Sequence, residues 1–290
     1  MEFYSRKEKI FGIINITLLI IFALSVLYPF VYIFSSSISS GYAVTTGKVM
    51  LFPKDITFDA YKELLKDSKL WIAYGNTFFY TIFGVLTSMF FSVTGAYALS
   101  KKRLLFRKQF NIFVAFTMWF NAGMIPIYLN FRDLHLLNSR LGIIFGFACT
   151  AFNIILLRNY FENIPSAIEE AARIDGVNEF QMLTKIYLPL SKPALTTVAL
   201  YYGIARWNGY FWSMILLRDE SKIPLQVYLK KKIVQSVVSE ETIVAAANAS
   251  FSPETLIYAT IILSIIPVVI IYPYIQKYFN KGVMVGGVKE

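Results

Sequence analysis

Six long runs of apolar residues alternate with polar segments along the chain. Each run approaches or exceeds roughly 20 residues, the length that crosses the hydrocarbon core of a bilayer as a helix. The pattern therefore predicts an all-α membrane protein, a single transmembrane domain over residues 1–290 with six transmembrane helices. The predicted spans are residues 10–34, 72–99, 109–131, 141–161, 194–217 and 256–279.

A polar segment, residues 165–193, separates the fourth and fifth predicted spans. Pro165 and Ser166 are expected to open a helix with one apolar face, and Gly176 to end it in the left-handed conformation. A second short helix is expected to carry three spaced apolar residues and to stop at two prolines: Phe180, Leu183, Ile186, Pro189 and Pro193.

Two short helices are marginal in water, so this segment needs a surface to pack against. A helical hairpin lying on the membrane is one possibility, but such anchors are rich in Lys and Arg on their polar face. Residues 165–193 carry a slight acidic excess instead. Docking to another protein is the favoured interpretation.

Composition agrees with a membrane protein. The chain is 56% hydrophobic and 16% charged, with a mean hydropathy of +0.54, whereas soluble domains are about 25% charged. The net charge of +10 does not indicate a nucleic-acid partner, because the basic residues lie at the ends of apolar runs. Such placement is typical of residues that set membrane topology.

The short connection 101–108 carries five positive charges and no acid, so it is predicted to be cytoplasmic. An even number of spans then puts both termini in the cytoplasm and the long connections 35–71 and 218–255 outside. The first apolar run is too long for a signal peptide and is interpreted as an uncleaved span. Pro126, Pro267 and Pro273 are expected to interrupt the spans that contain them.

The pattern Glu170-Ala171-Ala172, Asp175-Gly176, then Ile186 and Leu188-Pro189, resembles the EAA loop of bacterial ABC importer permeases. Trp207-Asn208 and the glycine-rich ending from Lys281 to Lys289 are similar to the carbohydrate-uptake class, and to maltose-type inner permeases in particular. Leu183 stands where that family often has Phe, an exchange that should still pack. The resemblance covers nearly the whole chain.

The resemblance implies that residues 166–176 form a coupling helix seated on a cytoplasmic ATPase, with Glu170 available to an arginine there. The chain has no phosphate-binding loop, so ATP and Mg are expected on partner ATPase subunits, with no cofactor and no enzymatic activity on this chain. The ATPase-coupling residues implied are Glu169, Glu170, Ala171, Ala172, Asp175, Gly176, Ile186, Leu188 and Pro189. The tail residues Gly286, Gly287 and Lys289 are implied to reach the ATPases as well.

The implied assembly is an importer in the bacterial cell membrane. Its parts would be this chain, a second permease subunit, two ATPase subunits and an extracytoplasmic solute-binding protein, surrounded by membrane lipid. The implied substrate is a sugar, with oligosaccharides favoured and acidic, uronate-containing ones as candidates.

A candidate substrate path follows from Arg206-Trp207-Asn208 and Tyr210 in the fifth span. Aromatic faces and an amide suit a carbohydrate, although an interfacial aromatic belt has the same composition. Arg206 within a span could meet a sugar carboxylate or could snorkel to the surface. Further candidates are Asn76, Tyr80, Trp119 and Asn121, of which the two asparagines could equally serve helix–helix contacts.

Other classes stay open at this stage. A permease for polyamines or phosphonates would share the EAA loop but not the Trp207-Asn208 context. A membrane-embedded transferase would need a carboxylate or histidine cluster, and a secondary transporter would need ionisable residues within spans. No metal-ligand spacing is visible, and His135, the single histidine, is expected to be solvated.

Overall fold

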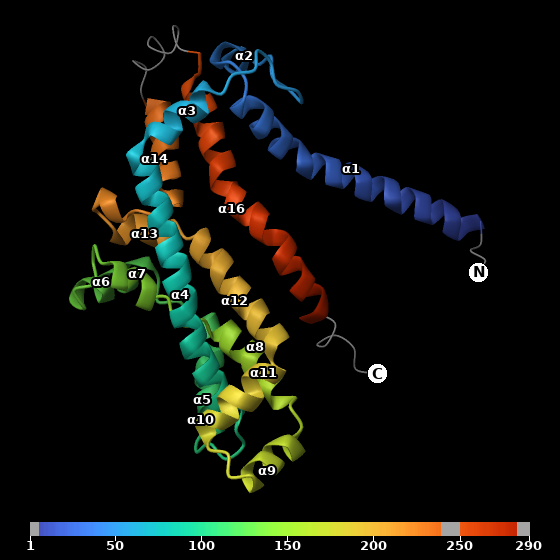
Figure 1. Cartoon of the computed structure of the whole chain (residues 1–290), viewed down its shortest axis with the longest axis vertical. Coiled ribbons are helices and arrows are strands. Elements are labelled where there is room, and N and C mark those ends of the chain that lie inside the picture. The colour runs from blue at the N-terminus through green and yellow to red at the C-terminus, as the bar shows by residue number, and fades with distance from the viewer. Residues whose placement is uncertain (1–5, 239–249, 283–290) are drawn as a thin grey trace. The chain divides into compact units, whose positions relative to one another are not determined.

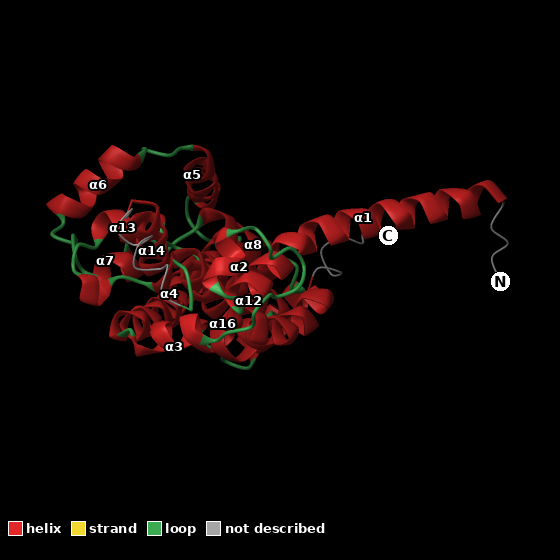
Figure 2. Ribbon diagram, turned by 90° about the horizontal axis from the view of Figure 1, so that it is seen from above, coloured by secondary structure: helices red, strands yellow, loops and turns green. Residues whose placement is uncertain are grey.

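The computed structural model describes residues 6–238 and 250–282 and divides into two compact units. Unit 1 comprises Met1–Leu70 with Leu229–Pro267, and unit 2 comprises Trp71–Tyr228 with Val268–Glu290. Every regular element within the described ranges is a helix (Figure 2). The predicted all-α class is confirmed.

Three helices are long and apolar enough to cross a membrane. They are α1 (Arg6–Ser37), α4 (Ser68–Ser100) and α16 (Pro253–Gly282), and they contain the first, second and sixth predicted spans. Pro267 and Pro273 lie inside α16 without breaking it, so the interruption expected there was wrong.

The third predicted span is divided into α5 (Arg107–Trp119) and α6 (Met124–Asp133), which are bent by 115°. The break does not lie at Pro126, as expected, but in the preceding residues. Gly123 has a φ of 87°, which glycine adopts at little cost, and its N–H donates to the Asn121 side chain over 2.9 Å. Pro126 falls in the first turn of α6, where its missing N–H has no helical partner to lose.

The fourth and fifth predicted spans are also divided. The fourth consists of α7 (Arg140–Phe145) and α8 (Ala151–Glu162), and the fifth of α12 (Lys192–Trp207) and α13 (Phe211–Leu216). Glycine allows the close approach at one of these breaks: a Cβ on Gly146 would lie 2.2 Å from the Phe131 ring. By length and composition, the described residues contain three spans, or four if the α5–α6 pair counts as one.

Unit 1 holds α2 (Gly41–Thr45) and α3 (Asp59–Lys66) against neighbouring segments of the same unit. The Tyr61 hydroxyl donates to Ser37 at the end of α1 over 2.8 Å. Ser250, just before α16, donates to Asp59 over 2.5 Å. This hydrogen bond, followed by those with Lys62 and Thr57, lowers the pKa of Asp59 to about 2. The connection between α1 and α3 is therefore ordered by polar contacts.

Unit 2 is built on α4, α8 and α12, which share one core. Unit 2 also contains η2 (Glu220–Lys222), α9 (Ser166–Ile174), α10 (Glu179–Gln181), a π-helix (Met182–Tyr187) and α11 (Leu188–Leu190). The helix α14 (Leu225–Val238) begins in unit 2, and its residues from Leu229 onward belong to unit 1. Figure 1 shows α9 and α10 together at one end of α4, α8 and α12. The core at this end contains Val93, Ala96, Tyr97, Leu157, Phe161, Ala172, Met182, Tyr187, Ala194, Val198 and Tyr202.

Candidate functional site

The helix expected after Pro165 is α9, and it ends as the sequence predicted. Gly176 has a φ of 76° and donates to the Arg173 carbonyl over 3.1 Å, while Val177 donates to the Ala172 carbonyl over 3.0 Å. This hydrogen-bond pair is the Schellman motif, which needs a left-handed residue directly after the helix. The left-handed Gly176 is confirmed.

The second half of the segment differs from the prediction. Asn178 and Gln181 form a capping box at α10, and the chain then continues through the π-helix and α11 into α12. Pro189 lies inside α11 and Pro193 at the second position of α12, so neither stops a helix. Both fall near helix starts, where the proline ring is tolerated.

The outward face of α9 combines acids with apolar side chains. Glu170, Ala171 and Asp175 are exposed, and Ile174 is 87% exposed. Beyond the turn, Phe180 is 75% exposed. Large apolar side chains this open to solvent indicate a surface that another molecule covers.

The inward face of α9 points to the unit 2 core. Ala172 is buried there, and Ile186 and Leu188 from the following segment pack against the same core. Pro189 is exposed. The residues implied by the EAA resemblance therefore divide between two faces, and the structure does not bring them together at one surface.

Glu169 lies on the inward side and receives three hydrogen bonds. The Lys101 ammonium and the Tyr187 hydroxyl both donate to its Oε2, over 2.8 and 2.7 Å, and Arg173 donates to its Oε1 over 2.6 Å. The Lys101 side chain is only 8% exposed. Its Nζ lies 4.3 Å from the centroid of the Tyr97 ring and 3.8 Å from that of Tyr187, in cation–π contact with both.

This environment fixes the charge of Glu169. Burial opposes ionisation, but the hydrogen bonds from Lys101, Tyr187 and Arg173 outweigh it and lower the pKa of the carboxyl to about 2. Burial and the bond to Glu169 raise the pKa of the Tyr187 phenol, which therefore stays protonated and donates.

Two more ion pairs tie the connection 101–108 to the segment around α9. Arg103 pairs with Glu179, whose other oxygen accepts from the Tyr97 hydroxyl over 2.7 Å. Arg107 pairs with Glu162 at the end of α8. The sequence interpretation used these cations only to orient the chain. The available signal was that a basic loop and an acidic segment were both predicted on one side of the membrane.

A polar cleft of about 840 Å³ opens beside α9. Lys102 and Arg107 line it from the 101–108 connection, and Glu170 lines it from α9. Neither Lys102 nor Glu170 forms an ion pair with another residue of the described ranges. The cleft therefore offers one unpaired charge of each sign to a partner.

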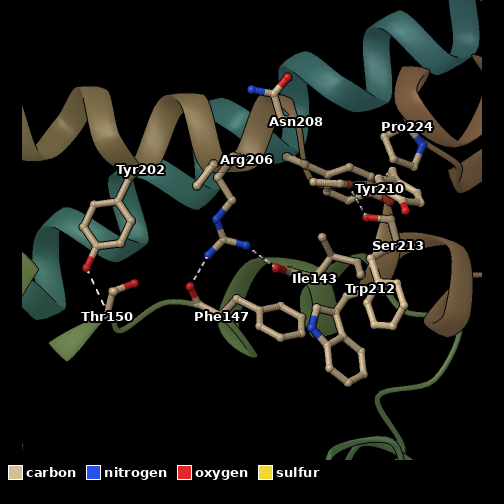
Figure 3. A pocket seen from close by; sticks show the side chains of 14 residues that line it. Ile143, Phe147, Thr150, Tyr202, Arg206, Asn208, Tyr210, Trp212, Ser213 and Pro224 are labelled. Carbon is tan, nitrogen blue, oxygen red and sulfur yellow. Dashed lines mark hydrogen bonds between the residues drawn. The ribbon is translucent and has the colours of Figure 1, made fainter. Parts of the chain in front are cut away.

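A second cavity, of about 350 Å³, lies between α12, α13 and the α7–α8 connection (Figure 3). Tyr80, Arg206, Asn208 and Tyr210 line it, which brings together four of the predicted substrate-path residues. The sequence interpretation missed several other lining residues that come from α7, from the α7–α8 connection and from α12: Ile143, Phe147, Thr150 and Tyr202.

The Arg206 guanidinium is held by the protein itself. It donates to the carbonyls of Ile143, Ile144 and Phe147 over 2.5, 3.0 and 2.7 Å, and to the Ser88 hydroxyl over 3.3 Å. Ile143 and Ile144 lie in the last turn of α7, where helical C=O groups lack intrahelical partners and favour a cation, and Phe147 lies in the connection that follows. Arg206 thus fixes α7 while its charge borders the cavity.

The other substrate-path candidates lie elsewhere. Trp207 is 7% exposed and packs edge-to-face on Phe78, with ring centroids 5.3 Å apart. Asn76 is buried and donates to the carbonyls of Ser221 and Ile223 over 2.8 and 3.0 Å. Trp119 and Asn121 are exposed at the α5–α6 break and are not among the cavity-lining residues.

The predicted tail residues Gly286, Gly287 and Lys289 lie outside the described residues. Over residues 6–238 and 250–282, no group of three or more His, Cys, Asp and Glu side chains could hold a metal ion.

Comparison with known proteins gives one family over residues 1–285, described as the binding-protein-dependent transport system inner membrane component. The chain is 37% identical over 284 residues to the polygalacturonan/rhamnogalacturonan transport system permease protein YtcP of Bacillus subtilis (strain 168). That match covers 98% of this chain and 99% of its relative.

Two solved structures are also similar. One is the crystal structure of a bacterial ABC transporter involved in the import of the acidic polysaccharide alginate, matched with 61% identity and a TM-score of 0.92. The match covers 96% of this chain and all of the other. A bacterial alginate ABC transporter in complex with an alginate pentasaccharide-bound periplasmic protein shares the fold, with a TM-score of 0.61 and 14% identity over 93% of each chain.

Proposed function

The chain belongs to the family of binding-protein-dependent transport system inner membrane components, and we propose that it is a permease subunit that imports acidic oligosaccharides with energy from separate ATPase subunits. In this proposal six membrane crossings, three of them made of broken helices, form half of the translocation path. A second permease subunit supplies the other half, and an extracytoplasmic binding protein delivers the sugar.

The outward face of α9 is the observation that carries the proposal. Glu170 and Ile174 project from a helix whose opposite side is fixed by Glu169 and Ala172. A helix held rigidly on one side and open on the other suits the docking of a second protein. The adjoining cleft, with Lys102 and Glu170, adds charges that an ATPase surface could pair.

Two observations support an acidic sugar as the substrate: the printed names of two similar proteins, and the positive charge of Arg206 beside the cavity. The printed names of the relatives with 37% and 61% identity refer to polygalacturonan/rhamnogalacturonan transport and to alginate import. In this chain the Arg206 cation borders a cavity whose aromatic side chains, including Tyr210, could stack on a sugar face. Because its hydrogen bonds go to backbone carbonyls, we propose that Arg206 attracts a carboxylate through its charge.

Cytoplasmic termini and a cytoplasmic α9 complete the proposal. The basic connection 101–108 pairs with acids of the α8–α10 region, which supports placing both on the same side of the membrane. The positive-inside rule then makes that side cytoplasmic. Gly286, Gly287 and Lys289 are proposed to extend towards the ATPases from the C-terminus.

The test is co-expression of this chain with its second permease and ATPase subunits, followed by purification through a tag on this chain. We expect Glu170→Lys and Ile174→Asp to reduce recovery of the ATPase by at least tenfold, since both change the outward face of α9. Glu63→Lys is the matched control, because it reverses an exposed charge on α3. Full ATPase recovery with both α9 variants would disprove docking at this face.

The substrate is tested separately in proteoliposomes that contain the complete transporter. Uptake of oligouronates that depends on ATP and on the binding protein supports the proposal. Uptake restricted to neutral oligosaccharides, or to polyamines, would contradict the acidic-sugar assignment while leaving the family intact.

A further inference from the structure

We infer that Lys101, through its ion pair with Glu169, transmits displacement of α9 to α4, and this inference rests on the proposed docking of α9 to an ATPase. α9 joins α8 and α12 through the chain itself, so movement of α9 reaches both helices covalently. α4 ends at Ser100, far from α9 in sequence, and can follow α9 only through noncovalent contacts.

The contacts between α4 and α9 are of two kinds. Ala96 and Tyr97 of α4 and Ala172 of α9 belong to one apolar core. Apolar packing is non-directional and resists separation more than sliding. The hydrogen-bonded ion pair between Lys101 and Glu169 is directional and resists both.

The geometry around Lys101 is unusually restrictive for a lysine. Its ammonium contacts the rings of both Tyr97 and Tyr187, at 4.3 and 3.8 Å from their centroids, and donates to Glu169 over 2.8 Å. Lysine normally keeps a flexible, hydrated head group, yet this side chain is 8% exposed. The enclosure removes the rotamer freedom that would otherwise absorb a displacement.

Tyr187 connects the Lys101–Glu169 ion pair to the segment that leads into α12. It is the last residue of the π-helix Met182–Tyr187, and its hydroxyl donates to Glu169 over 2.7 Å. π-helical turns are rare and are frequently found at functional sites. Glu169 therefore receives hydrogen bonds from the segments that lead to α4 and to α12, so one carboxylate links both helices to α9.

The second ion pair is a weaker link. Arg103 and Glu179 have side chains 51% and 48% exposed, and exposed pairs resist displacement little. Lys102 adds no ion pair with any residue of the described part of the chain. Lys101 is thus the position in the 101–108 connection at which loss of the side chain should uncouple α4 from α9.

The experiment measures uptake per ATP hydrolysed in proteoliposomes that contain the complete transporter and its loaded binding protein. We expect Lys101→Met, which keeps the apolar stem but loses the charge, to lower this ratio at least fivefold while the ATPase still co-purifies. Lys108→Met is the matched control, because Lys108 is exposed in the same connection and does not line the cleft, and it should keep the wild-type ratio. The exchange Lys101→Glu with Glu169→Lys should recover part of the ratio, because it restores an ion pair.

A wild-type ratio for Lys101→Met in the assembled complex would overturn the inference. If Lys101→Met does not assemble, Tyr187→Phe decides, because it keeps the ring and removes only the bond to Glu169; an unchanged ratio there also overturns the inference. Failure of the proposed function is distinguishable, because the wild-type complex itself would then show no ATP-dependent uptake.

Discussion

A methyl group on Gly84 would lie 2.8 Å from the Nε atom of Arg206 and 3.0 Å from its Cδ atom. Gly84 belongs to α4 and Arg206 to α12, so the absence of a side chain on one helix makes room for the cation of the other. Arg206 cannot easily move aside, because its guanidinium is bonded to three carbonyls near the end of α7. These two residues together determine how α4, α7 and α12 pack.

Gly84→Ala is therefore expected to lower the free energy of unfolding by about 1–3 kcal/mol, the usual cost of overpacking. Gly95→Ala is the matched control on the same helix, because a Cβ there has no neighbour within 4 Å. It should be neutral or stabilising by up to ~1 kcal/mol, since Ala is the better helix former. Thermal unfolding of the detergent-solubilised protein measures both, and equal effects would contradict the proposed steric role.

Replacing Arg206 separates its two roles. Lys keeps the charge but cannot donate in a fork to several carbonyls, whereas Gln loses the charge as well. We expect Arg206→Lys and Arg206→Gln to destabilise the protein similarly, by roughly 1–3 kcal/mol, because buried carbonyls lose their donors. Only Arg206→Gln should lower uptake of acidic relative to neutral oligosaccharides.

The comparison is made with purified transporter in proteoliposomes, with both substrates assayed on the same preparation. An equal loss of acidic and neutral uptake in Arg206→Gln would mean that Arg206 has only a structural role. Loss of the acidic preference in Arg206→Lys would show that hydrogen bonds, and not charge alone, recognise the carboxylate.

The pKa of Glu169 predicts a pH dependence for the attachment of α9. The carboxyl titrates near its ordinary pKa of about 4.5 when unfolded and at about 2 when folded. A depressed folded pKa contributes stability that is complete above about pH 4.5 and is lost as the pH falls towards 2. The difference in unfolding midpoint between wild type and Glu169→Gln should therefore be constant above pH 5 and shrink below it.

Unfolding curves of both proteins between pH 2 and pH 7 provide the measurement. If the wild type kept its full excess in unfolding midpoint over Glu169→Gln at pH 2, the assigned hydrogen-bond network around Glu169 would be contradicted.

Gly176 is expected to tolerate asparagine better than alanine. Its φ of 76° is in the left-handed region, and a Cβ there has no neighbour within 4 Å, so the cost of a side chain is conformational and not steric. Asn adopts this region more readily than Ala. Gly176→Ala should destabilise the end of α9 by about 1 kcal/mol and Gly176→Asn by less, with Gly176→Pro worse than either.

Amide hydrogen exchange over residues 166–176 measures the relative stability of the end of α9 in the three variants. ATPase co-purification shows whether docking of the ATPase weakens in the same order. Equal exchange in the Ala and Asn variants would mean that the left-handed conformation is not required. Normal uptake in Gly176→Pro would argue against α9 as the coupling element.

The local signals in this chain predicted local structure well. Pro165 and Gly176 bound α9 as expected, because caps act through neighbouring backbone groups that the sequence specifies directly. Proline was less informative. Pro126, Pro189 and Pro267 lie within helices or at their starts, since the packing of neighbouring segments decides where the chain bends.

The sequence by itself determined the class, the family and the position of the polar segment, because apolar run length, charge placement and motif spacing are linear properties of the chain. Only the tertiary structure decided which acid of the EAA segment faces inward and what a buried cation touches. Glu169 and Glu170 are adjacent and chemically identical, yet one is enclosed by Lys101 and Tyr187 and the other is exposed. The two side chains point in different directions because successive residues of a helix face different sides, and Glu169 meets partners that are distant in sequence. Motif spacing alone identifies neither the buried side of the helix nor those partners.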